Sequence, residues 1–475
     1  MIRKGDKVTN ASIIFLLVAL IQFLASFVML PIYLNTFSVE EFGTNELINR
    51  LALFLSIIIA LRISGAMANI YFTFDDKIQK QQFVSSLAQF TTLSGVGSSI
   101  VIFLLGYFLL PYFTTDGSFH MVIHGVCAIL SALASNVTSP YFFYLKNERK
   151  NLEFLFLHIF FVGALIGAQL VAIYLFRANF DTVIQIRSGF ALFQTIFLLL
   201  LYRSKFSLKI EWAFVRRALS YTVPLIPFLL LNWVQLYFDR FFVGNYLGGI
   251  ALGIFSFVLI LQNIQTTLID VFENAIRPSL MNQFKQADSH SPTLMAVQNK
   301  YVLAITVSAA FMLFGTILLP MITQYDLYAD NAILFFLIVP TGIAKGISLL
   351  FMQQLIFKEK SVELLKLVAM HVLGIFLLYF LLLDYMSLAI ILFVNLLVGC
   401  FMVFFYYQRA QQAQKLRFRL QQFYLPMAYI AVCVCCYFAH QAYQISITSL
   451  LIAQLLAVML PAFILLYQSR KMRVE

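Results

Sequence analysis

The chain has 475 residues, of which 61% are hydrophobic and only 11% are charged, and its mean hydropathy is +0.89. Since soluble proteins carry about a quarter charged residues, this composition excludes a water-soluble globular protein. The net charge of +11 therefore needs an explanation that applies to a membrane protein. The composition therefore predicts an all-α, polytopic membrane protein.

Apolar runs long enough to cross about 30 Å of hydrocarbon recur along the whole chain. We count fourteen: 11–34, 47–72, 84–110, 121–145, 152–176, 183–202, 220–238, 250–272, 296–319, 333–357, 367–383, 387–407, 425–440 and 447–467. The first run is too long for the core of a signal peptide and lacks a convincing cleavage site, so we expect it to remain as a span. The sixth reaches spanning length only if Arg187 is included.

The lysines and arginines predict the orientation of these spans. With the N-terminus in the cytoplasm, 26 of the 32 basic residues fall in alternate, inward-facing segments, while the outer loops are short and lean acidic. Both termini are therefore expected in the cytoplasm, and the positive charge is a topology signal that implies no nucleic-acid partner. The connection 203–219 predicts an amphipathic helix at the membrane surface, with Trp212 and a basic face at the lipid headgroups.

A faint internal repeat divides the chain. A shift of 210 residues places Asn35 on Asn245 and Gly43 on Gly253, each before the second span of its half. Repeats related by an axis along the membrane normal are typical of transporters, with the substrate path between the halves. We expect two six-helix lobes around a central cavity, followed by two C-terminal helices. The predicted parts are 1–212 (spans 1–6), 213–424 (spans 7–12) and 425–475 (spans 13–14 and a cytoplasmic tail).

Two basic residues lie near the middle of predicted spans, Arg62 in span two and Lys345 in span ten. A charge at the bilayer centre costs about 2.5–3.5 kcal/mol on insertion scales, so it normally faces a protein interior or a water-filled cavity. A structural ion pair needs an acid at similar depth, and Asp239, Asp270 and Glu273 all lie nearer span ends. The depth of both cations favours a cavity-facing role, with these acids as candidate partners.

The surroundings of Lys345 allow two interpretations. Gly342 and Gly346 flank it, and Pro340 lies five residues earlier. The glycines either permit close helix packing or, together with the proline, loosen the helix where it lines a cavity. The lysine between them favours the second interpretation.

Three further arginines lie at or near the outer ends of spans. Arg50 follows Glu46 by one helical turn and Arg240 adjoins Asp239, so interfacial pairing and substrate binding explain them equally well. Arg187 has no obvious partner. Several cations with few fixed acids suit an anionic substrate, and arginine binds phosphate or pyrophosphate through its bidentate fork.

The sequence contains no arrangement of residues typical of an enzyme. We find no Gly-rich phosphate loop, no metal-binding spacing of His and carboxylates, and no nucleophile beside an evident base. All five cysteines fall within predicted spans, which indicates neither disulfides nor a zinc site. We therefore expect no catalytic residue, no metal and no cofactor.

Two stretches resemble a known family. "RRALSYTVPLIPFLLLNWVQLYFDRFFVGNYLGGIALGIFSF" (Arg216–Phe257) is similar to the seventh and eighth spans of bacterial polysaccharide transporters, in Pro224, Pro227, Asp239-Arg240, "YLG" and "LGIFS". "EFGTNELINRLALFLSIIIALRISGAMANIYF" resembles the second span of the same family. These are the Wzx-like flippases of O-antigen or capsule repeat units, within the multidrug/oligosaccharidyl-lipid/polysaccharide exporter superfamily.

The resemblance implies two lobes around a cationic cavity that opens alternately to either side of the bacterial inner membrane. It implies translocation of an undecaprenyl-pyrophosphate-linked oligosaccharide to the outer leaflet, with Arg62, Lys345, Arg50, Arg187 and Arg240 as candidate ligands of the pyrophosphate. Members of this family are thought to use ion gradients, and the sequence leaves open whether protons or sodium ions are used. Polysaccharide polymerase machinery is the implied partner.

Two other functions stay open. An ion-coupled exporter of drugs or small molecules in the same superfamily is the main alternative. The first span, 11–34, carries no charged residue, whereas drug exporters often place a carboxylate there and the lipid II flippase an arginine–aspartate pair. A membrane-embedded glycosyltransferase or polymerase is the third possibility, but it normally needs a large outer loop or an acidic motif.

Overall fold

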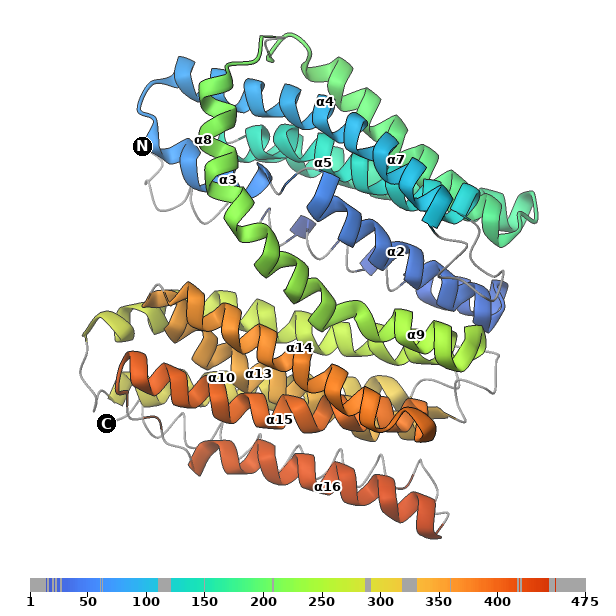
Figure 1. Ribbon diagram of the computed structural model, residues 1–475, viewed down its shortest axis with the longest axis vertical. Helices are drawn as coiled ribbons and strands as arrows, with labels where there is room; N and C mark the ends of the chain where they lie inside the picture. The colour runs from blue at the N-terminus through green and yellow to red at the C-terminus, as the bar shows by residue number, and fades with distance from the viewer. Residues whose placement is uncertain are drawn as a thin grey trace. The chain divides into compact units, whose positions relative to one another are not determined.

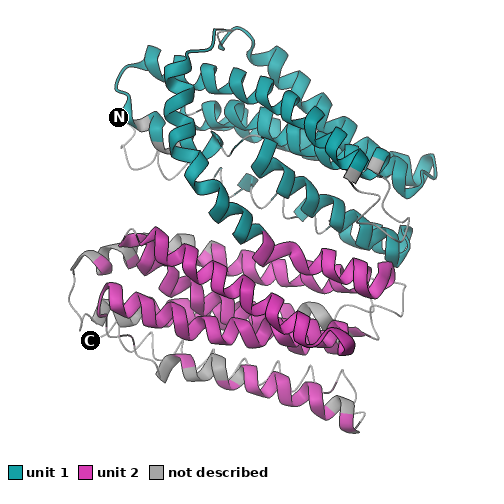
Figure 2. Cartoon of the chain, viewed as in Figure 1, with its two compact units in different colours: residues 1–233 teal, residues 234–475 magenta. Residues whose placement is uncertain are grey.

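A computed structural model describes most of the chain, and all regular structure in the described part is helical (Figure 1). The described residues are 28–59, 63–109, 121–148, 150–206, 209–286, 292–317, 331–358, 360–416 and 421–443, with single positions at 14, 17, 18, 21, 24, 25, 61, 418 and 449. The chain forms two compact units, residues 1–233 and 234–475 (Figure 2).

The described residues of unit 1 form seven complete α-helices. They are α2 (Val39–Ile59), α3 (Ile63–Ile70), α4 (Lys77–Leu109), α5 (Val126–Asn147), α6 (Asn151–Leu170), α7 (Phe180–Tyr202) and α8 (Trp212–Thr222). Short turns extend three of them: a 3₁₀ turn after α3 (Tyr71–Thr73), and π-helical turns before α5 (Met121–Gly125) and after α6 (Val171–Leu175).

Unit 2 begins within α9 (Ile226–Gln286) and continues with α10 (Pro292–Ile317), α13 (Phe335–Phe357), α14 (Ser361–Leu381), α15 (Leu388–Ala413) and α16 (Gln421–Tyr443). A 3₁₀ turn, Asn331–Leu334, leads into α13, and another, Leu383–Tyr385, follows α14. Helix α9 contains most of predicted span 220–238 and all of predicted span 250–272, joined by a kink at Gly248 rather than by a loop. Gly248 has φ of +86°, a conformation that is easily reached only without a Cβ atom.

The prediction of an all-α polytopic membrane protein is confirmed. Among the described residues, nine helices are long and apolar enough to cross a membrane, and one of these, Trp212–Asp270, covers two predicted spans. Helices α10 and α16 coincide with the predicted spans 296–319 and 425–440. The predicted fourteenth span, 447–467, lies outside the described residues apart from Ser449.

The predicted second span is wrong as a continuous helix. Helix α2 ends at Ile59 and α3 begins at Ile63, with Leu61 between them at φ of +47°. A left-handed backbone costs a residue with a Cβ atom roughly 1–2 kcal/mol, so the surrounding structure has to impose it. No glycine or proline marks this break in the sequence, which is why hydropathy alone missed it.

The predicted repeat appears in the backbone of the two units. The turn between α5 and α6 passes through Lys150 at φ −83° and ψ 53°, and the turn between α13 and α14 passes through Lys360 at φ −82° and ψ 52°. The Lys150 amide donates to the Leu145 carbonyl at 3.0 Å, and the Lys360 amide donates to the Leu355 carbonyl at 3.0 Å. Both pairs are related by the shift of 210 residues found in the sequence. The division into three parts at 212 and 424 remains a prediction.

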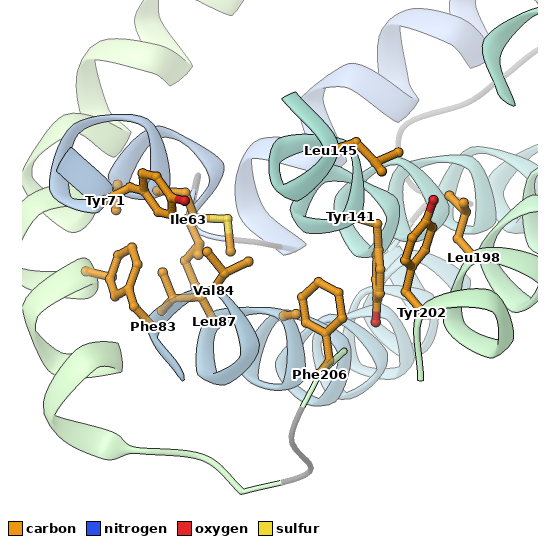
Figure 3. Packing of buried hydrophobic residues seen from close by; sticks show 14 of the residues in the cluster. Ile63, Tyr71, Phe83, Val84, Leu87, Tyr141, Leu145, Leu198, Tyr202 and Phe206 are labelled. Atoms are coloured by element: carbon orange, nitrogen blue, oxygen red, sulfur yellow. The ribbon is translucent and has the colours of Figure 1, made fainter. Parts of the chain in front are cut away.

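One core cluster of unit 1 lies where α3, α4, α5 and α7 meet the loop after α7 (Figure 3). The rings of Tyr141 and Phe206 pack against each other with centroids 4.6 Å apart and planes inclined at 51°, and Phe83 of α4 is fully buried in the same cluster. Helix α8 adds Val215 and Ala218 to this cluster. Close packing of these side chains fixes α8 against the helices of unit 1.

Among the candidate spans that the described residues form in unit 2, helix α13 is the most buried, and its two glycines make close contacts. A Cβ atom on Gly342 would lie 2.2 Å from Oε1 of Gln265, and one on Gly346 would lie 3.0 Å from Cγ1 of Ile305. The helix runs unbroken through Pro340. The preference for a loosened helix is therefore wrong, and the glycines serve close packing.

We predict that Gly342→Ala lowers the stability of the folded protein by about 1–3 kcal/mol, as overpacked cores do. Gln265 is fully buried and its Nε2 donates to the Val339 carbonyl at 3.3 Å, so it cannot move aside without losing that bond. Thermal unfolding in detergent measures the effect. Gly374→Ala is the matched control, because its Cβ would meet Val398 at an ordinary 3.6 Å. Equal stability of the two variants would contradict the packing role.

Candidate functional site

The break between α2 and α3 is held by a side chain from another helix. The last four carbonyls of a helix lack partners within that helix. One of them, the carbonyl of Ser56, accepts a hydrogen bond from Nδ2 of Asn136 on α5 at 3.0 Å. In a membrane, non-helical backbone is tolerated only inside the protein or along a water-filled cavity. Broken spanning helices mark substrate and ion sites in many transporters.

Arg62 follows this left-handed residue directly in the sequence, at the point where the helix is interrupted. Its own position lies outside the described residues. The sequence-based proposal for Arg62 therefore remains a prediction, although the break gives it a structural context that a continuous helix would not.

Arg50 forms the ion pair that its spacing predicted. Nη2 of Arg50 lies 2.7 Å from Oε2 of Glu46, and the side chains are 15% and 9% exposed. The other oxygen of Glu46 accepts from Nδ2 of Asn49 at 3.1 Å. Arg50 is thus held on the surface of α2 by a charge-assisted hydrogen bond.

Arg187 is bound by a neutral side chain that the sequence did not suggest. Its Nη1 donates to Oδ1 of Asn45 at 2.8 Å, across 142 residues of sequence. Tyr33 interacts electrostatically with both Arg187 and Glu46. Arg50 and Arg187 therefore belong to one group, the unit 1 cluster of Tyr33, Asn45, Glu46, Arg50 and Arg187. Its two arginines and one glutamate give it a net positive charge.

Lys345 differs from its neighbours on α13. The residues on either side of it, Ala344 and Gly346, are buried, whereas the lysine side chain is exposed. Its electrostatic neighbours are Asp270 and His371. Among the described residues, no carboxylate lies within ion-pairing distance of its ammonium group. This geometry matches a lysine that faces open space rather than a packed ion pair.

Glu273, another candidate partner of Lys345, is engaged elsewhere. It is 7% exposed and accepts a hydrogen bond from Nε2 of Gln353. Asp270 is the acid near Lys345, and its side chain is exposed as well. Asp270 is one of the acids that the sequence offered as a partner, and its role as a partner of Lys345 remains a prediction.

Asp239 and Arg240 interact electrostatically, but their side chains make different contacts. Asp239 is 9% exposed, and its oxygens accept hydrogen bonds from the Tyr379 hydroxyl at 2.9 Å and from Nδ2 of Asn395 at 2.7 Å. Arg240 is 2% exposed and its Cζ lies 5.6 Å from the ring centroid of Tyr237. The Arg240 side chain is therefore packed inside the protein in this conformation. The Asp239 carboxylate forms a hydrogen-bonded group with the Tyr379 hydroxyl and the Asn395 amide.

The sequence analysis missed Asn45, Tyr379 and Asn395. Tyr379 and Asn395 lie in apolar stretches, where a polar group is itself a signal, since a buried polar group needs a partner. Asn45 lies in the polar stretch before the second predicted span, where nothing in the sequence singles it out. His124 and Asp181 form a further missed pair, with Nε2 and Oδ1 2.9 Å apart. Among the described residues, no group of three or more His, Cys, Asp or Glu side chains is arranged to hold a metal ion.

No protein-family model and no curated protein sequence matches the chain. Solved structures do match. The lipid II flippase MurJ in an inward closed conformation aligns with a TM-score of 0.70 at 11% identity, over 97% of this chain and 100% of MurJ. An inward-facing multidrug resistance MATE family transporter of the MOP superfamily aligns with a TM-score of 0.62 at 10% identity, over 81% of this chain and 93% of that one.

An outward-facing MATE family transporter of the MOP superfamily also aligns, with a TM-score of 0.55 at 13% identity, over 86% of this chain and 94% of that one. At these identities the likeness concerns the fold. The chain is therefore a multi-pass membrane protein with the fold that these MATE transporters share with a lipid flippase.

We predict that Tyr379→Phe and Asn395→Ala have non-additive effects on stability, with a coupling of about 0.5–3 kcal/mol. Both side chains bond the same carboxylate, and Nδ2 of Asn395 also lies 3.3 Å from the Tyr379 hydroxyl. Thermal unfolding of the single and double variants measures the coupling. Tyr379→Phe combined with Thr306→Val is the control, since the Thr306 hydroxyl bonds the Val302 carbonyl of its own helix. Additivity in the first pair would show that the two side chains act independently.

Proposed function

We propose that the protein is a flippase that moves an undecaprenyl-pyrophosphate-linked oligosaccharide from the cytoplasmic to the outer leaflet of a bacterial inner membrane. The observation that carries the proposal is Lys345, an exposed cation between buried residues of the spanning helix α13. Charged side chains in spanning segments normally face the protein interior or a water-filled cavity, so an exposed cation there can bind an anionic group. Arg62 beside the break in the second span supplies the same chemistry in unit 1.

The fold supports this proposal. MurJ, whose name describes it as a lipid II flippase, aligns over nearly the whole chain. The MATE structures were solved facing inward and outward, which fits a mechanism of alternating access. O-antigen, capsule or exopolysaccharide repeat units are the proposed glycans, and the polymerase machinery that uses them is the proposed partner. The proposed topology has both termini in the cytoplasm.

The proposed ligands of the pyrophosphate are not equivalent. Lys345 and Arg62 are the principal candidates. Arg50 and Arg187 are already bonded within the unit 1 cluster, so they would contribute positive potential unless those bonds exchange for the substrate. Arg240 is too deeply buried to reach a ligand in this conformation.

An ion-coupled exporter of drugs or small molecules is the second candidate. It is favoured by the likeness to MATE transporters and by the carboxylates Asp239 and Asp270 in spanning helices. A pump for organic cations needs acids that its substrate can reach, and Asp270 is exposed. Drug resistance on overexpression, with the surface glycan unaffected by deletion of the gene, would favour this candidate.

We predict that Arg62→Ala and Lys345→Ala insert normally but stop export. Removing either cation takes away a charge-assisted bond to the pyrophosphate, so the lipid-linked oligosaccharide accumulates in the inner leaflet. Mass spectrometry of lipid-linked intermediates in the native host measures it, with the deletion strain complemented by each variant. Arg177→Ala, which removes an exposed cation, is the control. Full export by both single variants would remove these residues from the mechanism.

Asp239 is our proposed site for a coupling proton or sodium ion. A carboxylate within the membrane is costly unless it is protonated, paired or bound to a cation, and its two oxygens here are arranged by Tyr379 and Asn395. We expect Asp239→Asn to lose the dependence of transport on a sodium or proton gradient imposed on proteoliposomes. Asp384→Asn, an exposed acid next to α14, is the control. Unchanged gradient dependence in Asp239→Asn would exclude this role.

A further inference from the structure

Helix α8 is amphipathic and is docked on unit 1 by one face. Val215 and Ala218 are 1% and 0% exposed within the core cluster, whereas Trp212 is 65% exposed. The Phe214 ring makes edge contacts with Phe83 and Phe74, at centroid distances of 5.7 and 5.5 Å. The helix is therefore fixed in position while its other face remains uncovered by described residues.

An open hollow of about 630 Å³ lies beside α8, where the docked face that carries Val215 meets the exposed face that carries Trp212. It is lined by Trp212, Val215, Arg216, Leu219, Ser220 and Val223. Residues four apart on a helix share a face, so these six form two parallel rows. The row Trp212, Arg216 and Ser220 is amphipathic or polar, and the row Val215, Leu219 and Val223 is aliphatic. A ligand that matches both rows has an anionic head and an apolar chain.

The two adjacent arginines of α8 have different roles. Arg217 donates from Nη2 to Oγ1 of Thr73 at 3.1 Å, and its Cζ lies 5.2 Å from the ring centroid of Phe74. Arg216 is exposed, lines the hollow, and makes no hydrogen bond or ion pair with any described residue. Arg216 therefore has its whole guanidinium fork available for a phosphate.

The surrounding charge favours an anionic lipid. Residues 203–222 contain five basic side chains and one acid, Glu211. The surface of the cytoplasmic leaflet is negative, and each Lys or Arg near it contributes about 1 kcal/mol of attraction. Trp212 is of the residue type that lies at the level of lipid headgroups.

We propose that the hollow on α8 binds an anionic phospholipid of the cytoplasmic leaflet, with its phosphate on Arg216 and an acyl chain along Leu219 and Val223. Trp212 lies against the glycerol region. This site is independent of the transported substrate, and it makes α8 an anchor rather than only a linker. The helix leads through the turn Val223–Leu225 directly into α9, so the lipid contacts the segment with which the second repeat begins.

The tryptophans offer a direct test, because the chain has only Trp212 and Trp233 and the second is 7% exposed. In a Trp233→Phe background, Trp212 is the sole reporter. The full-length protein is reconstituted in phosphatidylcholine vesicles with increasing fractions of brominated phosphatidylglycerol or, in parallel, brominated phosphatidylcholine. We expect phosphatidylglycerol to quench Trp212 at a lower mole fraction than phosphatidylcholine does.

Arg216→Gln should reduce the preference for phosphatidylglycerol about five-fold, the factor expected for one basic residue near an anionic surface, while Arg217→Gln should leave most of it. Ser220→Phe, which fills the hollow and keeps every charge, should abolish the preference. An absent preference in the parent protein overturns the proposal. An equal loss in Arg216→Gln and Arg217→Gln also overturns it, because the attraction would then be diffuse. Circular dichroism of each variant confirms folding, and Ser220→Phe tests the site should Arg216→Gln misfold.

Discussion

The structure depends on one constraint, that every backbone polar group in hydrocarbon finds a partner within the protein. Continuous helices meet it without help, which explains the helical character of the described chain. Where a helix is interrupted, a side chain has to take over, and Nδ2 of Asn136 does so for the Ser56 carbonyl at the end of α2. The left-handed conformation of Leu61 is therefore part of the fold of unit 1. It interrupts the second predicted span next to Arg62 in the sequence.

The same constraint sorts the intramembrane charges by their surroundings. Arg50 is neutralised by Glu46, and Arg187 is satisfied by the neutral Asn45. Arg240 is buried against Tyr237, while Lys345 alone among these four is exposed on a buried stretch of helix. Removing the partner of a buried charge destabilises the structure, because it leaves that charge uncompensated. An exposed charge such as that of Lys345 is stabilised only by water or by a ligand, which is why Lys345 is the principal candidate for binding an anionic group.

Local features were predictable from the sequence and distant ones were not. Hydropathy sets the spans because it sums over about twenty residues, and the Arg50–Glu46 pair follows from its i, i+4 spacing. Arg187 and Asn45 are 142 residues apart, and Asp239 lies 140 residues from Tyr379, so only the fold brings them together. No glycine or proline in the sequence marks the break at Leu61. The packing of Gly342 against Gln265 likewise needed the neighbouring helix.

The internal repeat places different polar side chains at equivalent positions of the two units. The turns at Lys150 and Lys360 agree in backbone geometry, and the same shift of 210 residues relates Gln169 of α6 to Tyr379 of α14, both buried polar residues. Gln169 bonds Tyr33 in the cationic unit 1 cluster, whereas Tyr379 bonds the carboxylate of Asp239. Equivalent positions thus serve opposite charges.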